Sequence, residues 1–326
     1  MSMVTPPYSR TVTVSVPATS ANLGPGFDCL GLALELRNEA AVTATGPDLP
    51  WDSTAATEYT VAVSGVDAAK VPADRHNLFI AAAEALFRRA GRRPSALAVR
   101  MVNRVPVGSG LGSSSSAIVA GLLAANAALD AGLCERDLLQ MAVEMEGHPD
   151  NVAPAMLGGL VLGVLPDPIA GPAELVLRRM DPPRLTAVVV LPDFHLLTAD
   201  ARAALPPDVS RADAIFNASR LGLLLHGLTT GDYNSLRVAM ADRLHQPYRL
   251  RLIPGAAEAY AAAYAAGALG VALSGAGPSL LAFTTGGEAD TDIAAAMGNA
   301  FLAAGLGSRS WTLQPSTGGA HCTVIQ

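Results

Sequence analysis

A glycine- and serine-rich segment, VPVGSGLGSSSS at residues 105–116, limits the folds open to this chain more than any other stretch. Before it, the alternating residues Ala96 to Val102 predict a β-strand. After it, apolar residues recur at helical spacing from Ala117 to Leu129. A strand, a glycine turn and a buried helix gather backbone N–H groups and a positive helix end around one point, which suits phosphate. The segment therefore predicts a phosphate-binding loop.

This loop differs from the two common glycine motifs that bind nucleotides. No lysine follows Gly112, the last glycine, so the loop is not a Walker A motif. It also lacks the first strand and the later acidic partner of a dinucleotide fingerprint. Taken alone, a glycine turn whose serines cap the next helix would give the same pattern.

The rest of the chain predicts a mixture of strands and helices in two halves. The proline-rich run Pro166 to Pro172 is the best candidate for a domain boundary. We therefore expect two domains, residues 1–168 and 169–326. We expect strands at residues 11–17, 30–36, 59–63, 158–164, 185–191 and 270–273, and helices at 77–90, 135–147, 212–229 and 256–266.

Charge and composition exclude several classes of function. The 326 residues are 50% hydrophobic and 15% charged, which predicts a compact core. A net charge of −6 provides no basic field for nucleic acid or anionic lipid, so we expect a small-molecule substrate. The uncharged stretch Ala259 to Gly287 is long enough to span a bilayer, but its glycines and Pro278 predict a helix end, a strand and a turn instead.

Cysteine use and the N-terminal residues predict a cytoplasmic protein. Cys29, Cys134 and Cys322 are odd in number, far apart and not at metal-ligand spacing, which fits unpaired thiols in a reducing compartment. Met1 to Arg10 lacks the basic patch and apolar run of a secretory signal.

Three short motifs extend over nearly the whole chain. Pro106 to Ser114 spells Pro-x-Gly-x-Gly-Leu-Gly-Ser-Ser, Pro17 to Asp28 reads PATSANLGPGFD, and Ser274 to Ser279 reads SGAGPS. In wording and order they resemble the motifs of the GHMP kinases. The resemblance implies an α+β fold with an N-terminal domain like ribosomal protein S5 domain 2 and a ferredoxin-like C-terminal domain. ATP and the phosphate acceptor would meet between the two domains.

Finer details resemble the homoserine kinases within that superfamily. They are the TSANLG wording near the N-terminus, the run HPDNVAP at residues 148–154, the pair Gly158-Gly159, and Thr198-x-x-x-Arg202. The resemblance implies an enzyme that moves the γ-phosphate of ATP onto the side-chain hydroxyl of L-homoserine, in threonine biosynthesis. Mg²⁺ would assist.

Carried over residue by residue, the resemblance assigns Asn77 to the base or ribose of ATP, and Ser114 and Glu144 to catalysis and to Mg²⁺. Mg²⁺ typically takes one or two protein oxygens beside phosphate oxygens and waters. Glu146, on another helix face, is the rival carboxylate. Ser115 and Ser116 depart from the family, which more often has alanine after the second serine, so the hydroxyl that meets the metal stays open. The loop residues assigned to ATP are Pro106, Val107, Gly108, Ser109, Gly110, Leu111, Gly112, Ser113, Ser114, Ser115 and Ser116.

An amino-acid substrate needs an anion for its ammonium, a cation for its carboxylate and a partner for its hydroxyl. The resemblance assigns Asp28 to the ammonium, and Arg202 and Arg249 to the carboxylate, which suits a planar guanidinium fork. Arg251 is a rival to Arg249. The other residues assigned to the substrate are Asn22, His148, Asn151, Thr198 and Gly275.

The pair Asp150-Asn151 bears on how the hydroxyl loses its proton. Some GHMP kinases resemble one another in using an Asp just before an Asn as a general base. The homoserine kinases are thought to lack a base, with the Asn binding the hydroxyl and the phosphate accepting the proton, which a loose transition state tolerates. We therefore expect Asn151 to be catalytic and leave the role of Asp150 open.

Three other functions are weighed against this one. Another GHMP kinase, for mevalonate, a sugar or shikimate, is disfavoured by the Asp and paired Arg. A catalytically silent sensor of nucleotide or metabolite is disfavoured by Glu144 and the intact loop. RNA binding, suggested by the ribosomal-protein likeness, is disfavoured by the acidic balance. A homodimer is a further expectation.

Overall fold

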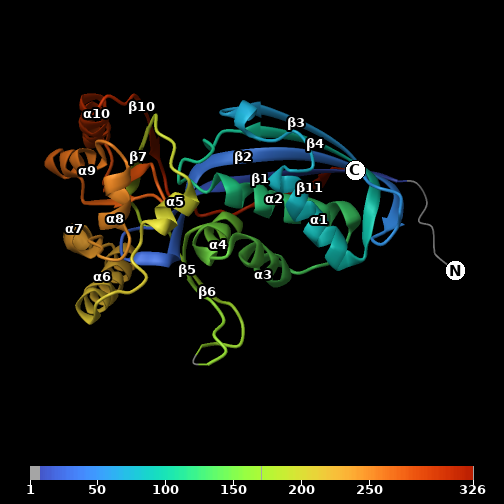
Figure 1. Cartoon of the computed structure of the whole chain (residues 1–326), viewed down its shortest axis with the longest axis horizontal. Coiled ribbons are helices and arrows are strands. Elements are labelled where there is room, and N and C mark those ends of the chain that lie inside the picture. Colours follow the sequence, from blue (N-terminus) through green and yellow to red (C-terminus); the bar gives the residue numbers. More distant parts are fainter. Residues whose placement is uncertain (1–7, 170, 326) are drawn as a thin grey trace.

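The computed structural model describes residues 8–169 and 171–325 in two layered parts (Figure 1). Residues 1–7, most of the segment in which no secretory signal was expected, lie outside the described residues. The larger part holds a seven-stranded sheet in the order β11-β1-β2-β4-β3, with β5 beside β2 and β6 beside β5. Its strands are β1 (Ser9–Asn22), β2 (Gly26–Pro50), β3 (Glu58–Gly65), β4 (Arg92–Asn103), β5 (Leu160–Val164), β6 (Val176–Met180) and β11 (His321–Ile325).

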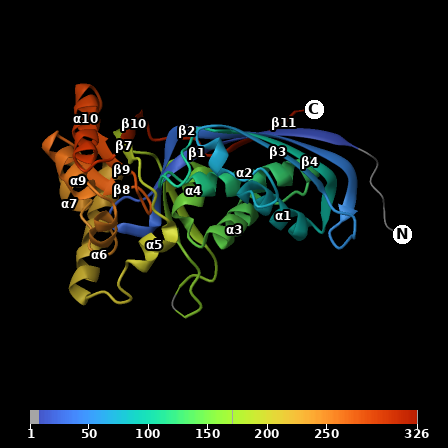
Figure 2. The same cartoon turned by 45° about the horizontal axis from the view of Figure 1, so that its top comes forward.

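Four helices cover one face of this sheet (Figures 1 and 2). In β1, the buried Val12, Val14 and Val16 alternate with half-buried Thr and Ser, so one face of the strand meets the helices. Each fully buried apolar side chain of this kind contributes roughly 1.5–3 kcal/mol. The central helix α2 packs on the other three as well as on β1. The helices are α1 (Leu78–Ala90), α2 (Ser113–Leu129), α3 (Glu135–Glu146) and α4 (Pro149–Leu157), and the short 3-10 turn η1 (Ala68–Lys70) precedes α1.

The smaller part is built on a four-stranded antiparallel sheet in the order β10-β7-β9-β8. Its strands are β7 (Thr186–Pro192), β8 (Gly270–Leu273), β9 (Leu280–Thr284) and β10 (Ser308–Leu313). Its helices are α5 (Thr198–Ala203), α6 (Arg211–Thr230), α7 (Leu236–Ala239), α8 (Gln246–Arg249), α9 (Ala256–Ala265) and α10 (Glu288–Ala303), with 3-10 turns η2 (Tyr233–Ser235) and η3 (Leu250–Leu252).

The two parts share a hydrophobic cluster. Strand β7 is buried along its whole length. Val188 and Val190 point into a cluster with α9 and α10, whereas Ala187 and Val189 point into a second cluster. That second cluster also holds residues of β1, β2 and α6, among them Leu32. The β1–β2 hairpin thereby fixes the smaller part against the larger one.

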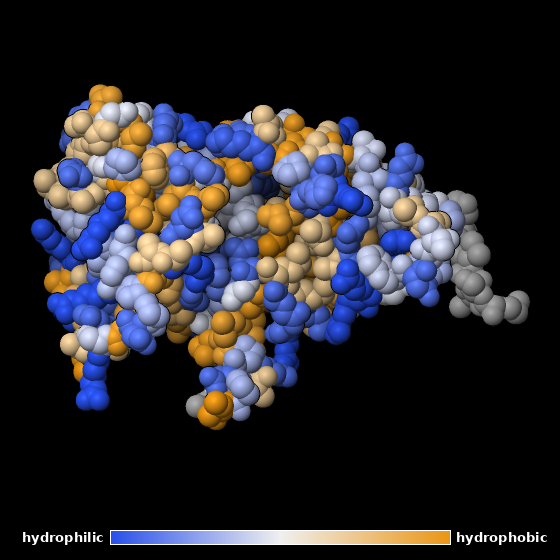
Figure 3. All heavy atoms as spheres, in the orientation of Figure 1, coloured by the Kyte–Doolittle hydropathy of each residue, from blue (hydrophilic) through white to orange (hydrophobic). Residues whose placement is uncertain are grey.

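The expected division at residues 168 and 169 does not follow the sheets. Strand β6 pairs with β5 across the proline-rich run, and β11 returns from the far end of the chain to pair with β1. The run is the loop of a hairpin, because Val164 lies opposite Val176. Figure 3 shows apolar atoms at the tip of this projecting loop, where Ile169 is almost fully exposed.

The uncharged stretch from Ala259 to Gly287 is divided among several short elements. It runs through the end of α9, then β8 and β9, as its glycines predict. Within the described residues, no helix has the length and apolar character needed to cross a bilayer.

Candidate active site

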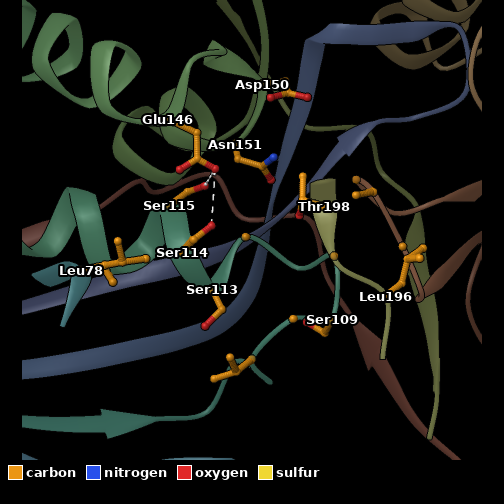
Figure 4. A pocket seen from close by; sticks show the side chains of 18 of the residues that line it. Leu78, Ser109, Ser113, Ser114, Ser115, Glu146, Asp150, Asn151, Leu196 and Thr198 are labelled. Carbon is orange, nitrogen blue, oxygen red and sulfur yellow. Dashed lines mark hydrogen bonds between the residues drawn. The ribbon is translucent and has the colours of Figure 1, made fainter. Parts of the chain in front are cut away.

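A cavity of about 370 Å³ lies where the three sequence motifs meet. The phosphate loop, the α3–α4 junction, α5 and the C-terminal SGAGPS turn all contribute to its wall. Figure 4 shows Ser113, Ser114, Ser115 and Asn151 around this space. The wall therefore combines residues that are remote in sequence.

The loop's shape depends on glycine at two positions. Gly110 has φ +81°, and a Cβ there would lie 2.2 Å from the carbonyl oxygen of Ser274. Gly112, the residue before α2, has φ +69°, and its Cβ would lie 2.0 Å from Thr19 Oγ1. Only glycine fits such backbone angles and such close approach. The N-terminus of α2 consequently opens into the cavity, which favours an anion.

The motifs are held together by hydrogen bonds. Ser274 Oγ donates to the carbonyl of Gly110 at 2.8 Å, so in its 2.8 Å contact with Ser20 Oγ it acts as the acceptor. Asn22 Nδ2 donates to the carbonyl of Gly275 at 2.8 Å. These bonds tie the N-terminal motif and the SGAGPS turn to the phosphate loop. The turn from Ser274 to Ser279 therefore supports the phosphate loop.

The carboxylate beside the phosphate loop belongs to Glu146. Ser115 Oγ donates to Glu146 Oε1 at 2.9 Å, and Ser114 Oγ lies 3.4 Å from the same oxygen (Figure 4). Burial raises the pKa of Glu146, and the Ser115 hydrogen bond opposes that rise. Glu144 is exposed, accepts from Gln140 Nε2 at 2.9 Å and is absent from the cavity wall. This corrects the expectation for Glu144, which does not reach the cavity wall, and leaves Glu146 as the carboxylate beside the loop serines.

The face of α3 that packs inward explains the correction. Residues 138, 139, 142 and 143 are buried, and position 146 continues that stripe at helical spacing. Glu144 lies on the opposite side with Gln140, four residues earlier.

Asn77 lies behind the cavity wall, at the end formed by residues 70–72 and β4. Its side chain accepts from the Phe79 N–H at 2.9 Å, capping α1, and donates to the Pro72 carbonyl at 2.7 Å. Asn77 is 1% exposed and does not line the cavity. Pro106, Leu111 and Ser116 also lie behind the wall, while the other loop residues reach it. The sequence reasoning missed Lys70, Val71, Pro72, Leu78, Met101 and Asn103, which line this end.

The other end of the cavity carries the charged side chains. Arg202 and Asp28 form a two-bond ion pair, at 2.8 and 3.0 Å. Arg249 is 2% exposed, and burial together with the charge of Arg202 lowers its pKa to about 10. Both guanidiniums lie over the ring of Phe27, at 5.9 and 5.0 Å from its centroid. Arg251 is exposed and absent from the wall.

Residues of the HPDN segment complete this end. His148 Nδ1 is hydrogen-bonded to the buried Asp150 carboxylate. Burial alone would lower the pKa of His148, but the hydrogen bond and charge of Asp150 outweigh it and raise that pKa. Thr19 Oγ1 donates to Asn151 Oδ1 at 2.7 Å, a contact that sequence reasoning missed. All expected substrate residues line the cavity: Asn22, Asp28, His148, Asn151, Thr198, Arg202, Arg249 and Gly275.

Comparison with known families agrees with this architecture. The family model described as GHMP kinases N terminal domain matches residues 77–159, and the one described as GHMP kinases C terminal matches residues 224–303. The fold and the glycine loop define a small-molecule kinase of the GHMP class. Homoserine kinase of Moorella thermoacetica is 42% identical over 94% of this chain and 98% of its own. Homoserine kinase of Gloeobacter violaceus is 48% identical over 83% and 87%. The chain belongs to the homoserine kinase family.

Solved structures agree with this placement. Homoserine kinase from Cytophaga hutchinsonii is 30% identical, with a TM-score of 0.83 over 96% of this chain and 97% of that one. Mevalonate kinase of L. major is 17% identical, with a TM-score of 0.71 over 96% and 99%, and shares the fold. The fold thus extends beyond the homoserine kinases, so selectivity must come from side chains in the cavity.

Proposed function

We propose that this protein transfers the γ-phosphate of ATP to the side-chain hydroxyl of L-homoserine, a step of threonine biosynthesis. One observation supports the proposal most strongly. An anion, Asp28, and two cations, Arg202 and Arg249, converge a short way from a phosphate loop. An amino acid carries the complementary charges, whereas a sugar carries neither.

ATP would lie along the loop with its triphosphate at the N-terminus of α2. The backbone N–H groups there and the hydroxyls of Ser113, Ser114 and Ser115 are the donors available to it. Glu146 and Ser114 offer the hard oxygen ligands that Mg²⁺ prefers, and would hold the ion. The ion would neutralise charge on the transferred phosphate. Asn77 would act indirectly, by holding the Pro72 segment against the base.

The acceptor hydroxyl would be aligned by Asn151. Its Oδ1 already accepts from Thr19, which leaves the amide N–H groups for the substrate oxygen. Asp150 is engaged with His148 and is 2% exposed, which favours a supporting role over that of a base. Phosphoryl transfer depends chiefly on alignment and charge neutralisation, so the phosphate itself can take the proton late.

The cytoplasm is the compartment we propose, because Cys29, Cys134 and Cys322 are all free thiols.

A panel of acceptors tests the proposal. ADP release is measured with L-homoserine, mevalonate, galactose and shikimate, each at saturating ATP and Mg²⁺. We expect L-homoserine to give the highest kcat/KM by a wide margin. Faster turnover of mevalonate or galactose would be consistent with the kinase class but would contradict L-homoserine as the substrate.

A further inference from the structure

The phosphate loop contains no charged side chain of its own. Residues 105–116 read VPVGSGLGSSSS, so the loop can offer an anion only backbone N–H groups and serine hydroxyls. A triphosphate carries several negative charges, and kinases and ATPases balance them with Mg²⁺ together with a lysine or an arginine. Among the described residues of the cavity wall, the other basic side chains stand at the opposite end with Arg202, and Lys70 alone supplies positive charge beside the loop.

Lys70 reaches the cavity from the short turn η1. It lines the wall together with Val107 and Gly108, at the start of the loop. The same three residues also line an adjoining cleft between the two parts of the molecule. The Lys70 side chain is 59% exposed, so its own packing does not fix the place of its ammonium group. A further contact has to do so.

Asp67 provides that contact and holds the loop as well. One carboxylate oxygen lies 3.2 Å from Lys70 Nζ, and the other accepts from the Val107 N–H at 3.1 Å. The second oxygen also lies 3.9 Å from Nη2 of Arg309, on strand β10 of the smaller part. The Asp67 backbone has φ +54°, and its side chain does not cap η1, the turn that follows it. The carboxylate is therefore directed at the loop rather than at its own turn.

A carboxylate in this place is not explained by stability or by the loop alone. The Asp67 side chain is 14% exposed, and a negative charge close to a triphosphate repels it. An ion pair with a partner as exposed as Lys70 adds little to stability. A neutral amide oxygen would satisfy the Val107 N–H equally well. A carboxylate differs from such an amide in holding a cation, here Lys70.

We propose that Lys70 binds the phosphates of ATP, and that Asp67 is the positioning residue that aims Lys70 and fixes the start of the loop. The proposal rests on the proposed function, because it takes ATP as the occupant of the loop. Asp67 does not touch the nucleotide and acts through Lys70 and Val107. Its negative charge repels phosphate, but the ammonium group that it holds in place more than compensates.

The sign of the change in Asp67→Asn tests the proposal. Asparagine tolerates a positive φ and keeps an oxygen for the Val107 N–H, so this variant should fold and lose only its hold on the cations. We expect KM for ATP to rise about tenfold, while kcat at saturating ATP and KM for L-homoserine stay within about twofold of the parent. Charge repulsion alone predicts the opposite sign, because it is relieved in this variant. A lower or unchanged KM for ATP would overturn the proposal.

Lys70→Gln and the double variant show whether Asp67 acts through Lys70. Because Lys70 is exposed, Lys70→Gln should fold, and it should also raise KM for ATP about tenfold. The two effects should not multiply in the double variant, because the contact that Asp67 supports is already gone. A rise of about 100-fold there would show independent effects and contradict the positioning role.

Adenosine distinguishes the phosphates from the rest of the nucleotide. Measured as a competitor of ATP, it should bind Lys70→Gln as tightly as the parent, because adenosine has no phosphate. An equal loss of affinity for adenosine and ATP would place Lys70 on the base or ribose and contradict the proposal.

Asp74→Asn is the matched control. Asp74 lies between η1 and α1, accepts from the His76 N–H at 2.8 Å and is absent from the cavity wall. The variant makes the same charge change in the same segment and should leave KM for ATP as in the parent. A rise equal to that of Asp67→Asn would reveal a general charge effect and overturn the proposal. Failure of the proposed function is seen separately, in a parent that does not phosphorylate L-homoserine with ATP at all.

Discussion

The two ends of the cavity are built in different ways. At the phosphate end, backbone N–H groups and three serines are positioned by glycine geometry within one stretch of chain, and Glu146 of α3 lies beside them. At the acceptor end, Asp28 of the hairpin pairs with Arg202 of α5, and His148 pairs with Asp150 of α4. Arg249 of α8 is held by the backbone carbonyls of Ala201 and Gly275. The first arrangement can serve any phosphoryl donor of this fold. The second fits one kind of acceptor.

The difference predicts different sensitivities. The phosphate end should fail when its backbone is disturbed, because close packing leaves no room for even a methyl group. The acceptor end should instead change what it binds when a charge is removed. The following predictions probe this contrast.

Gly110→Ala should have the largest effect. A non-glycine residue at φ +81° and a Cβ 2.2 Å from the Ser274 carbonyl should lower the free energy of unfolding by about 2–6 kcal/mol and abolish ATP binding. Gly91→Ala is the control, because Gly91 has φ +69° but nothing within 4 Å of its Cβ, so it should lose only about 1–2 kcal/mol. Chemical denaturation and nucleotide titration measure both. Equal losses would show that the Ser274 contact does not hold the loop.

Glu146→Gln should have the second-largest effect. Removing the carboxylate beside Ser114 and Ser115 should lower kcat by about 100-fold or more at saturating Mg²⁺, because a metal ion supplies several kcal/mol of charge stabilisation. Homoserine affinity should hardly change. Glu144→Gln, two residues earlier on the exposed face, should behave like the parent. The reverse ranking would restore Glu144 as the metal ligand.

Thr19→Val should lower kcat about tenfold, since the buried Asn151 Oδ1 loses its donor and the amide can turn. KM for ATP should stay as in the parent, because the change affects the acceptor end. Thr19→Ser keeps the hydroxyl and should restore most of the rate. If valine and serine variants had the same kcat, Thr19 would matter only for packing.

The smallest effect concerns pH. The folded pKa of His148 lies above 6.5 because of Asp150, so its pairing stabilises the fold fully below pH 6.5 and is lost as pH rises through the folded pKa. A pKa that is one unit higher in the folded state than in the unfolded state contributes about 1.4 kcal/mol to the free energy of unfolding. Asp150→Asn should lower the His148 pKa in an NMR titration and flatten the pH dependence of unfolding. An unchanged His148 titration in this variant would show that Asp150 does not raise the His148 pKa.

The contrast also explains which parts of the fold could be predicted from the sequence alone. The phosphate loop was predictable because strand, glycine turn and helix adjoin in the chain, and α1, α3 and β8 end close to where their glycines and periodicity predicted. Strand β11 could not be predicted in this way, because it pairs with β1, which lies at the opposite end of the sequence. The sequence also could not distinguish the proline-rich run from a domain linker, because a hairpin loop and a linker have the same composition.

For the candidate site, helical spacing held more information than motif position. The stripe of buried residues at 138, 139, 142 and 143 points to Glu146, whereas the family carry-over placed the metal at Glu144. No local pattern could reveal the Asp28–Arg202 pair or the Thr19–Asn151 contact, because each joins residues more than 100 positions apart. The glycine loop is therefore readable locally, whereas the contacts between side chains at the acceptor end are visible only in three dimensions.

Phosphorus NMR of the reaction product tests the central claim most directly. The protein is incubated with ATP, Mg²⁺ and L-homoserine, and the phosphorus signals are followed with time. We predict that the γ-phosphate signal is replaced by a phosphomonoester coupled to the side-chain methylene protons of homoserine, in step with ADP. Inorganic phosphate alone, or no loss of ATP, would contradict the assignment.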